Sequence, residues 1–165
     1  ATTITGYETD QEAFDEISNE IISLLGEYHR LYTIYHRFDG MNNLCTVNKN
    51  AGGEPLEVDA RLIDFLLYAK EMYALTGGEM NVMMGSVLKL WHDARTAASK
   101  NSENAAIPPM EQLREAMAHT DISLLEIDVE KSTVRISDPA ARIDVGALGK
   151  GYATEQARHN VCTFL

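Results

Sequence analysis

The sequence predicts an α+β fold, in which helices pack on a mainly antiparallel mixed sheet within a single domain covering residues 1–165. Two patterns carry this prediction. Apolar residues recur every three or four positions in several segments, which is typical of amphipathic helices, and residues 124–137 alternate apolar and polar side chains around a turn, which is typical of a hairpin. Because strands and helices do not alternate regularly, a βαβ winding is disfavoured. With 165 residues, of which 45% are hydrophobic, the chain can bury a sizeable core.

The N-terminal segment predicts one strand followed by one long helix. Residues 2–7 are rich in β-forming side chains, and Thr9 and Glu12 have the capping-box spacing for a helix that begins at about Asp10. The apolar positions of this helix share one stripe, which we expect to face a core. Those positions are Phe14, Ile17, Ile21, Leu24, Tyr28, Leu31 and Tyr35. Most of the tyrosines in this segment are therefore expected to be packing residues.

Residues 38–55 show little periodicity and hold several glycines and asparagines, so they predict a long, turn-rich connection. Long ordered loops often bind ligands, and amide side chains offer a donor and an acceptor that could read the edge of a base or an isoalloxazine ring. Asparagine is equally an ordinary turn residue, and both interpretations stay open. Asp59 then caps a second helix, which Gly77 and Gly78 end.

The remaining elements are shorter. Residues 79–91 indicate an extended piece, a glycine and an apolar helical turn. A polar segment over residues 96–106 follows. Pro108 and the proline after it introduce a third helix, which continues to about His119. The alternating residues 124–137 then form the predicted hairpin.

Composition and charge narrow the classes of function. Fourteen basic against 25 acidic side chains give a formal charge of -11, which repels nucleic acid and anionic membrane surfaces. No apolar run in the sequence approaches the ~20 residues of a membrane span, and the opening residues show no basic-then-apolar signal.

Cys45 and Cys162 could pair only if the fold brings them together. The sequence contains neither a C-x-x-C motif nor a histidine spacing typical of zinc sites.

Residues 143–157, IDVGALGKGYATEQA, carry the strongest functional pattern. Gly146, Gly149 and Gly151 lie between an apolar segment and a helix-compatible run, which predicts a strand, a tight turn and a helix start. Glycine lets the backbone approach a ligand, and the N–H groups of a first helical turn favour an anion such as phosphate, with Lys150 adding a positive charge. A tight connection with an exposed lysine is the plain alternative. The spacing fits neither a Walker A loop nor the G-x-G-x-x-G dinucleotide motif.

Three segments resemble the ApbE family of FAD:protein FMN transferases. Residues 78–91, GEMNVMMGSVLKLW, resemble the family stretch G-x-F-D-I-T-V-G-P-L-V-x-L-W, and residues 144–153, DVGALGKGYA, resemble D-L-G-G-I-A-K-G-Y-A. Residues 39–44 resemble, with less specificity, an Asn-containing loop of the family. The chain departs from the family pattern at Asn81, which replaces the usual Asp, and at Gly149, which replaces the usual Ala.

The resemblance implies an enzyme that splits FAD at its pyrophosphate, attaches FMN to a threonine hydroxyl of an acceptor flavoprotein and releases AMP, with Mg²⁺ as the metal. By matching positions, the implied flavin-binding residues are Met41, Asn42, Asn43, Asp144 and Lys150. The backbone carbonyl of Ala147 is the implied magnesium ligand, because an alanine can coordinate a metal only through its backbone.

The resemblance also implies partners, location and extent. The acceptor would be a flavoprotein subunit of the Rnf or sodium-pumping NADH:quinone reductase type, and the enzyme an extracytoplasmic, membrane-anchored lipoprotein. Family members are longer, so the chain is expected to correspond to the N-terminal part of their domain. The catalytic histidine and the Asp and Thr magnesium ligands are then expected outside these 165 residues, which alone should not transfer FMN. Two alternatives stay open: a non-catalytic FAD- or nucleotide-binding protein, and a structural segment whose glycine turn packs a helix on the sheet.

Overall fold

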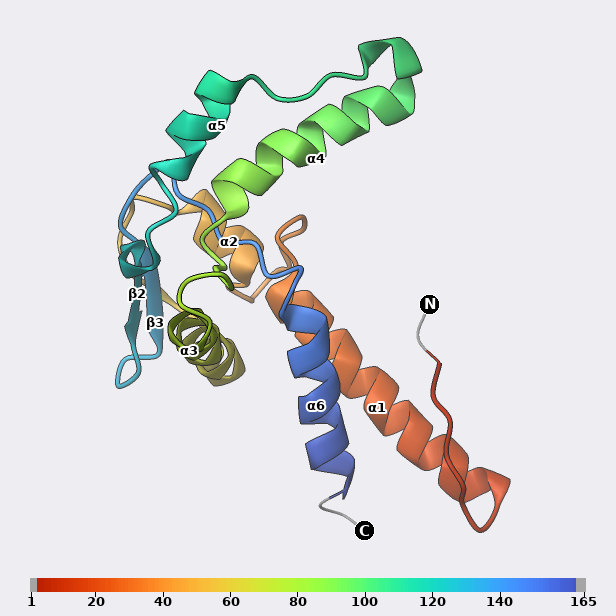
Figure 1. Cartoon of the computed structure of the whole chain (residues 1–165). Helices are drawn as coiled ribbons and strands as arrows, with labels where there is room; N and C mark the ends of the chain where they lie inside the picture. Colours follow the sequence, from red (N-terminus) through yellow and green to blue (C-terminus); the bar gives the residue numbers. More distant parts are fainter. Residues whose placement is uncertain (1–2, 163–165) are drawn as a thin grey trace.

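A computed structural model describes residues 3–162 of the chain and shows helices gathered around a small sheet (Figure 1). The α-helices are α1 (Gln11–Tyr32), α2 (Leu44–Lys49), α3 (Ala60–Leu75), α4 (Gly85–Lys100), α5 (Met110–Met117) and α6 (Gly149–Cys162). Two short 3₁₀ helices, Ser102–Asn104 and Ile122–Leu124, precede α5 and the hairpin respectively. The strands are β1 (Leu56–Glu57), β2 (Leu125–Asp128) and β3 (Thr133–Ile136).

The sheet is antiparallel throughout, in the order β1-β3-β2. Val134 in the central strand pairs with Leu56 on one side and with Ile127 on the other. The alternating pattern of residues 124–137 therefore forms the predicted hairpin, and Ser132 in its turn takes a left-handed φ of 51°. The predicted α+β class with a mainly antiparallel sheet is confirmed.

The hydrophobic core lies between this sheet, α3 and the C-terminal end of α1. Figure 1 shows α3 beside the sheet, with α1 and α6 running together away from it. The largest fully buried apolar side chains come from all of these regions, and they are Leu31, Leu44, Leu62, Phe65, Leu66, Met83, Leu125, Ile136 and Ile143. Burial of each such side chain contributes about 1.5–3 kcal/mol to folding, so this cluster holds the helices on the sheet.

Helix α1 begins at Gln11, close to the predicted start, but its cap is Asp10 and not the predicted Thr9, because the Asp10 side chain accepts a hydrogen bond from the backbone N–H of Ala13. Its apolar stripe is buried mainly near its C-terminal end, at Tyr28 and Leu31. The expectation for Tyr35 was wrong, since this residue lies beyond the end of the helix and is 62% exposed. The predicted strand at the start of the chain is also absent from residues 3–8, while Thr2 lies outside the described residues.

The connection over residues 38–55 is more ordered than its composition predicts, because it contains α2. Asn43 caps this helix by accepting a hydrogen bond from the backbone N–H of Thr46. Leu44 and Val47, three positions apart, are both buried and anchor the helix on the core. A single helical turn is too short to produce a periodic signal in the sequence.

Helix α4 is longer than the single turn that residues 79–91 indicate, and it continues through Lys100. In Figure 1, α4 and α5 form an arm that leaves the body on the side away from α1 and α6. The second half of α4, residues 93–100, contains no large apolar side chain, so apolar periodicity does not reveal that the helix continues. Among residues 3–162 no helix is long and apolar enough to cross a membrane.

Cys45 is buried, with 1% of its surface exposed, and forms no disulfide with any side chain in the described part of the chain. The side chain of Cys162 lies outside the part of the chain that can be described. Pairing of these two cysteines therefore stays a hypothesis.

Candidate functional site

The glycine-rich turn lies between the core and the first turn of α6. Backbone N–H of Asp144 donates to the carbonyl of Val82 at 2.8 Å, and the Asp144 carboxylate accepts from the N–H of Gly146 at 2.8 Å. The predicted strand before the turn is wrong, because Arg142 makes a single parallel bridge with Met84. The predicted turn and helix start are confirmed, with α6 beginning at Gly149.

Two glycines allow the close approaches that place this turn. The N–H of Gly85 donates to the carbonyl of Arg142 at 3.1 Å, and a Cβ at Gly85 would lie 2.5 Å from that oxygen. Gly149 is buried, and a Cβ there would touch Val145 at 3.4 Å and Tyr32 at 3.5 Å. The first contact forbids a side chain, whereas the contacts at Gly149 are ordinary van der Waals distances that an alanine could make.

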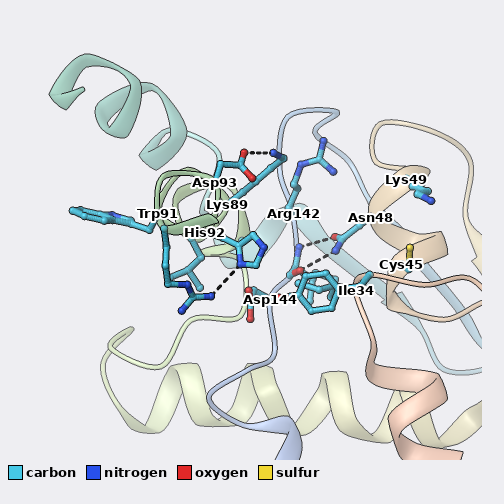
Figure 2. A pocket seen from close by; sticks show the side chains of 15 residues that line it. Ile34, Cys45, Asn48, Lys49, Lys89, Trp91, His92, Asp93, Arg142 and Asp144 are labelled. Carbon is cyan, nitrogen blue, oxygen red and sulfur yellow. Dashed lines mark hydrogen bonds and ion pairs between the residues drawn. The ribbon is translucent and has the colours of Figure 1, made fainter. Parts of the chain in front are cut away.

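Asn48 holds the turn from the opposite side. Its Nδ2 donates to the carbonyl of Ile143 at 2.9 Å, and its Oδ1 accepts from the Ile143 N–H at 2.7 Å. Figure 2 shows this pair of bonds immediately beside Asp144. Because Asn48 is 8% exposed and Ile143 is fully buried, the pairing fixes the backbone from which Asp144 projects. Sequence reasoning missed Asn48, which is one of several asparagines in a segment without periodicity.

Two cavities meet at Asp144. The first, here called the α4 cavity, has a volume of about 650 Å³ and lies between α2, α4 and Arg142. The second, the α6 cavity, has a volume of about 690 Å³ and lies between α1 and the first turns of α6. Ile34, Tyr35 and Asp144 line both. Volumes of this size are typical of sites for small molecules and cofactors.

Aromatic rings and one cation line the α6 cavity. Tyr28 and Tyr32 from α1 face Lys150 and Gly149 from α6 across it. The Tyr32 ring stacks on Phe65 at a centroid distance of 4.3 Å, and its buried hydroxyl has no hydrogen-bond partner among residues 3–162. Burial is the main cause that raises the pKa of Tyr32 well above its usual value, so the hydroxyl stays protonated and can donate.

Lys150 is exposed, and its ammonium group has no partner in the described part of the chain. It stands in the first turn of α6, where backbone N–H groups lack helical acceptors and favour a negative charge. Asp144 and Lys150, which the sequence analysis assigned to one site, therefore do line one cavity. The arrangement can receive an anion at its Lys150 end and an apolar group against the wall to which the largely buried tyrosines contribute.

The Ala147 carbonyl is left free in the turn. The carbonyl of Val145 accepts from the N–H groups of Leu148 and Gly149, and that of Leu148 accepts from Tyr152. No hydrogen bond from the described residues ends on the carbonyl of Ala147, which is exposed. A free carbonyl oxygen is a suitable ligand for a hard cation such as Mg²⁺. Within residues 3–162, no group of three or more His, Cys, Asp or Glu side chains is placed to hold a metal.

The other predicted flavin-binding residues lie elsewhere. Met41 and Asn42 line a third, more polar cavity of about 520 Å³, and Asn42 donates to the Glu57 carbonyl at 2.9 Å. Asn43 is completely buried, where it caps α2 and donates to two backbone carbonyls, those of Arg30 and His36. Their assignment to a flavin stays a prediction, which the structure separates in space from Asp144 and Lys150.

Comparisons with known proteins point in one direction. The model of the ApbE family matches residues 2–162. An FAD:protein FMN transferase of Treponema pallidum is 27% identical over 118 residues, which are 68% of this chain and 31% of that protein. One from Klebsiella pneumoniae is 22% identical over 144 residues, 87% of this chain and 42% of that protein.

Solved structures show the same fold. The crystal structure of the ApbE protein from Thermotoga maritima superimposes with a TM-score of 0.76 at 23% sequence identity, covering 96% of this chain and 48% of that one. The chain thus spans less than half the length of these curated relatives and of this structural neighbour.

Proposed function

The chain belongs to the ApbE family, and from this we propose that it forms part of an FAD:protein FMN transferase and supplies the cleft that binds FAD. The observation that carries the proposal is the family match over residues 2–162, joined to a glycine turn that presents Asp144 and Lys150 to one cavity. The activity for which these relatives are named supports transfer of FMN from FAD to a protein.

The proposed place for FAD is the α6 cavity. Tyr28 and Tyr32, which are 5% and 7% exposed, form part of its apolar wall, against which a flavin or adenine ring could pack. Lys150 and the first turn of α6 would oppose the charge of the pyrophosphate, and the Tyr32 hydroxyl could donate to the ligand. Asp144, at the inner end of the cavity, would contact the ligand where the two cavities meet.

In the proposed reaction the hydroxyl oxygen of an acceptor threonine forms a bond to the phosphorus of the FMN phosphate. The bond from that phosphorus to the bridging pyrophosphate oxygen breaks, and AMP leaves with this oxygen. The hydroxyl proton is released to solvent, so no oxidant or reductant is needed. Positioning and charge neutralisation supply most of the catalysis in such transfers; Lys150 would neutralise phosphate charge, and Asp144 would position the ligand.

Magnesium is part of this proposal. The free carbonyl of Ala147 fits a hard cation, because it is exposed and unpaired within the described residues. A bound Mg²⁺ would neutralise charge on the phosphates. The residues of this chain would contribute the carbonyl and hold the turn that presents it.

The acceptor and the location follow from family resemblance alone. We propose an acceptor flavoprotein of the Rnf or sodium-pumping NADH:quinone reductase type, and an extracytoplasmic protein held at the membrane by a lipid anchor. Fractionation of cells that express the tagged full-length protein, with labelled fatty acid as the anchor probe, tests the location. Recovery of unlabelled protein from the cytoplasm would contradict it.

The activity is tested with the full-length protein, FAD, Mg²⁺ and an acceptor domain that carries a threonine. We expect covalent flavin on the acceptor and one AMP released for each flavin transferred. FAD binding without AMP release would instead support the non-catalytic flavin-binding alternative. No FAD binding at all would overturn the proposal.

A further inference from the structure

The α4 cavity is not used by the proposed flavin site, yet it is open and charged. It is lined by four cationic side chains against two carboxylates. The cations are Lys49, Lys89, Arg95 and Arg142, and the carboxylates are Asp93 and Asp144. In a chain whose formal charge is -11, a local excess of positive charge marks a surface suited to an acidic partner.

Two of these cations are available to a ligand. Lys89 is paired with Asp93 one helical turn away, and Arg95 lies 3.1 Å from a ring nitrogen of His92. Lys49 and Arg142 make no side-chain hydrogen bond or ion pair within residues 3–162. In Figure 2 both project from the side of the cavity above Asn48.

The walls of the α4 cavity are aromatic and apolar. Tyr35 is 62% exposed, Trp91 45% and Leu88 42%, and all three line the cavity. The Tyr35 and His92 rings lie 5.8 Å apart between their centroids. Exposed aromatic residues beside arginine are typical of the centres of protein interfaces, whereas a free anion needs no such walls.

The position of the cavity adds the last step. Because Asp144 lines both cavities, an occupant of the α4 cavity meets an occupant of the α6 cavity at that residue. Group transfer requires a donor and an acceptor to meet in this way. We propose that the α4 cavity binds the acceptor protein through an acidic segment beside the threonine that receives FMN. This inference rests on the proposed function for its chemistry, but the docking surface can be tested separately.

The test measures binding of a short fluorescent peptide that has a central threonine, aspartates on both sides and leucines at its ends. A matched peptide carries asparagine in place of each aspartate. Both are titrated with the full-length protein, with the double variant Lys49→Glu, Arg142→Glu, and with the control double variant Lys100→Glu, Arg114→Glu. The control changes the net charge equally at exposed positions on α4 and α5 away from the cavity.

We expect the acidic peptide to bind at least about tenfold more tightly than the neutral one, and the cavity variant to lose this difference while the control keeps it within about twofold. Equal binding of the two peptides, or equal losses in both variants, would overturn the inference. FAD titrations of the same proteins provide the second readout. A parallel loss of FAD affinity in the cavity variant would assign the cavity to the nucleotide and also overturn the inference. Failure of the parent protein to bind FAD, with peptide selectivity intact, would count against the proposed function alone.

Discussion

The segments at residues 42–48 and 144–150 are both rich in polar groups, but they differ in what those groups bond to. In the first, the amides of Asn42, Asn43 and Asn48 all bond to backbone groups of the protein. In the second, the carbonyl of Ala147 and the ammonium of Lys150 have no partner within residues 3–162. Satisfied polar groups build a site and unsatisfied ones are available to a ligand, so the two segments should respond differently to mutation.

The largest effect is expected for Asn48→Ala. The change leaves the N–H and the carbonyl of Ile143 unpaired in the core, which should lower the free energy of unfolding by about 2–4 kcal/mol. FAD affinity should fall as well, since Asp144 follows directly on the released backbone. Urea unfolding and an FAD titration measure the two effects. A variant that is as stable as the parent but binds FAD more weakly would indicate that Asn48 contacts the ligand. The contrast between the two segments would then be wrong.

Asn43→Ala should destabilise almost as much, while its neighbour provides the matched control. Loss of the α2 cap and of the two bonds that the buried Asn43 amide makes to backbone carbonyls should cost about 2–3 kcal/mol. Asn42→Ala removes one exposed bond, to Glu57, and should cost less than about 1 kcal/mol. Thermal unfolding of both variants gives the difference. Equal stability of the two variants would show that the buried hydrogen bonds of Asn43 do not contribute more to stability than the exposed bond of Asn42.

Lys150→Ala should have the opposite profile. Its unfolding free energy should stay within about 0.5 kcal/mol of the parent, because the side chain is exposed and unpaired within the described residues. FAD binding should weaken by about 1–3 kcal/mol at low salt, since a charged contact to the pyrophosphate is lost. Lys100→Ala, at the exposed end of α4, is the control. Unchanged FAD affinity would remove Lys150 from the proposed site.

The smallest effect concerns the connection that leads into the turn. The hydrogen bond with the His119 ring at 2.6 Å, together with one from the Ala140 N–H, lowers the pKa of the Asp138 carboxyl. Because the pKa is lower in the folded state, the ionised carboxylate stabilises the fold at pH values above the unfolded pKa of about 3.9. This stabilisation is lost as the pH falls through the folded-state pKa. Asp138→Asn should therefore cost under about 1 kcal/mol at neutral pH, because the pair is partly exposed. The unfolding free energies of the parent protein and the variant should converge between neutral pH and about pH 3. A difference that stays constant with pH would assign the effect to packing.

Much of the fold could be predicted because its signals are local. The helix that begins close to Asp10, the helix that Asp59 begins and the alternation that forms the hairpin each depend on neighbouring residues. The two helices that were underestimated, α2 and α4, are a single turn and a largely exposed helix, which periodicity detects poorly.

The part of the site that could be predicted from the sequence is the part that lies in a recognisable motif. Glycine spacing indicated the turn with Asp144 and Lys150, and the structure lines one cavity with both. The role of Asn48 could not be predicted, because its partner Ile143 is 95 positions away. Nor could the burial of Asn43 be foreseen, since an asparagine in a turn-rich segment looks the same whether its amide faces solvent or the core.

The separation between Asn48 and Ile143 has a consequence for the order of folding. Joining distant positions costs chain entropy, so we expect this contact to form after the intervening helices and hairpin have drawn the ends together. We expect the N-terminal helices to assemble early and the turn to reach its final position late. At the proposed flavin site, a bound nucleotide would then report that this long loop has closed.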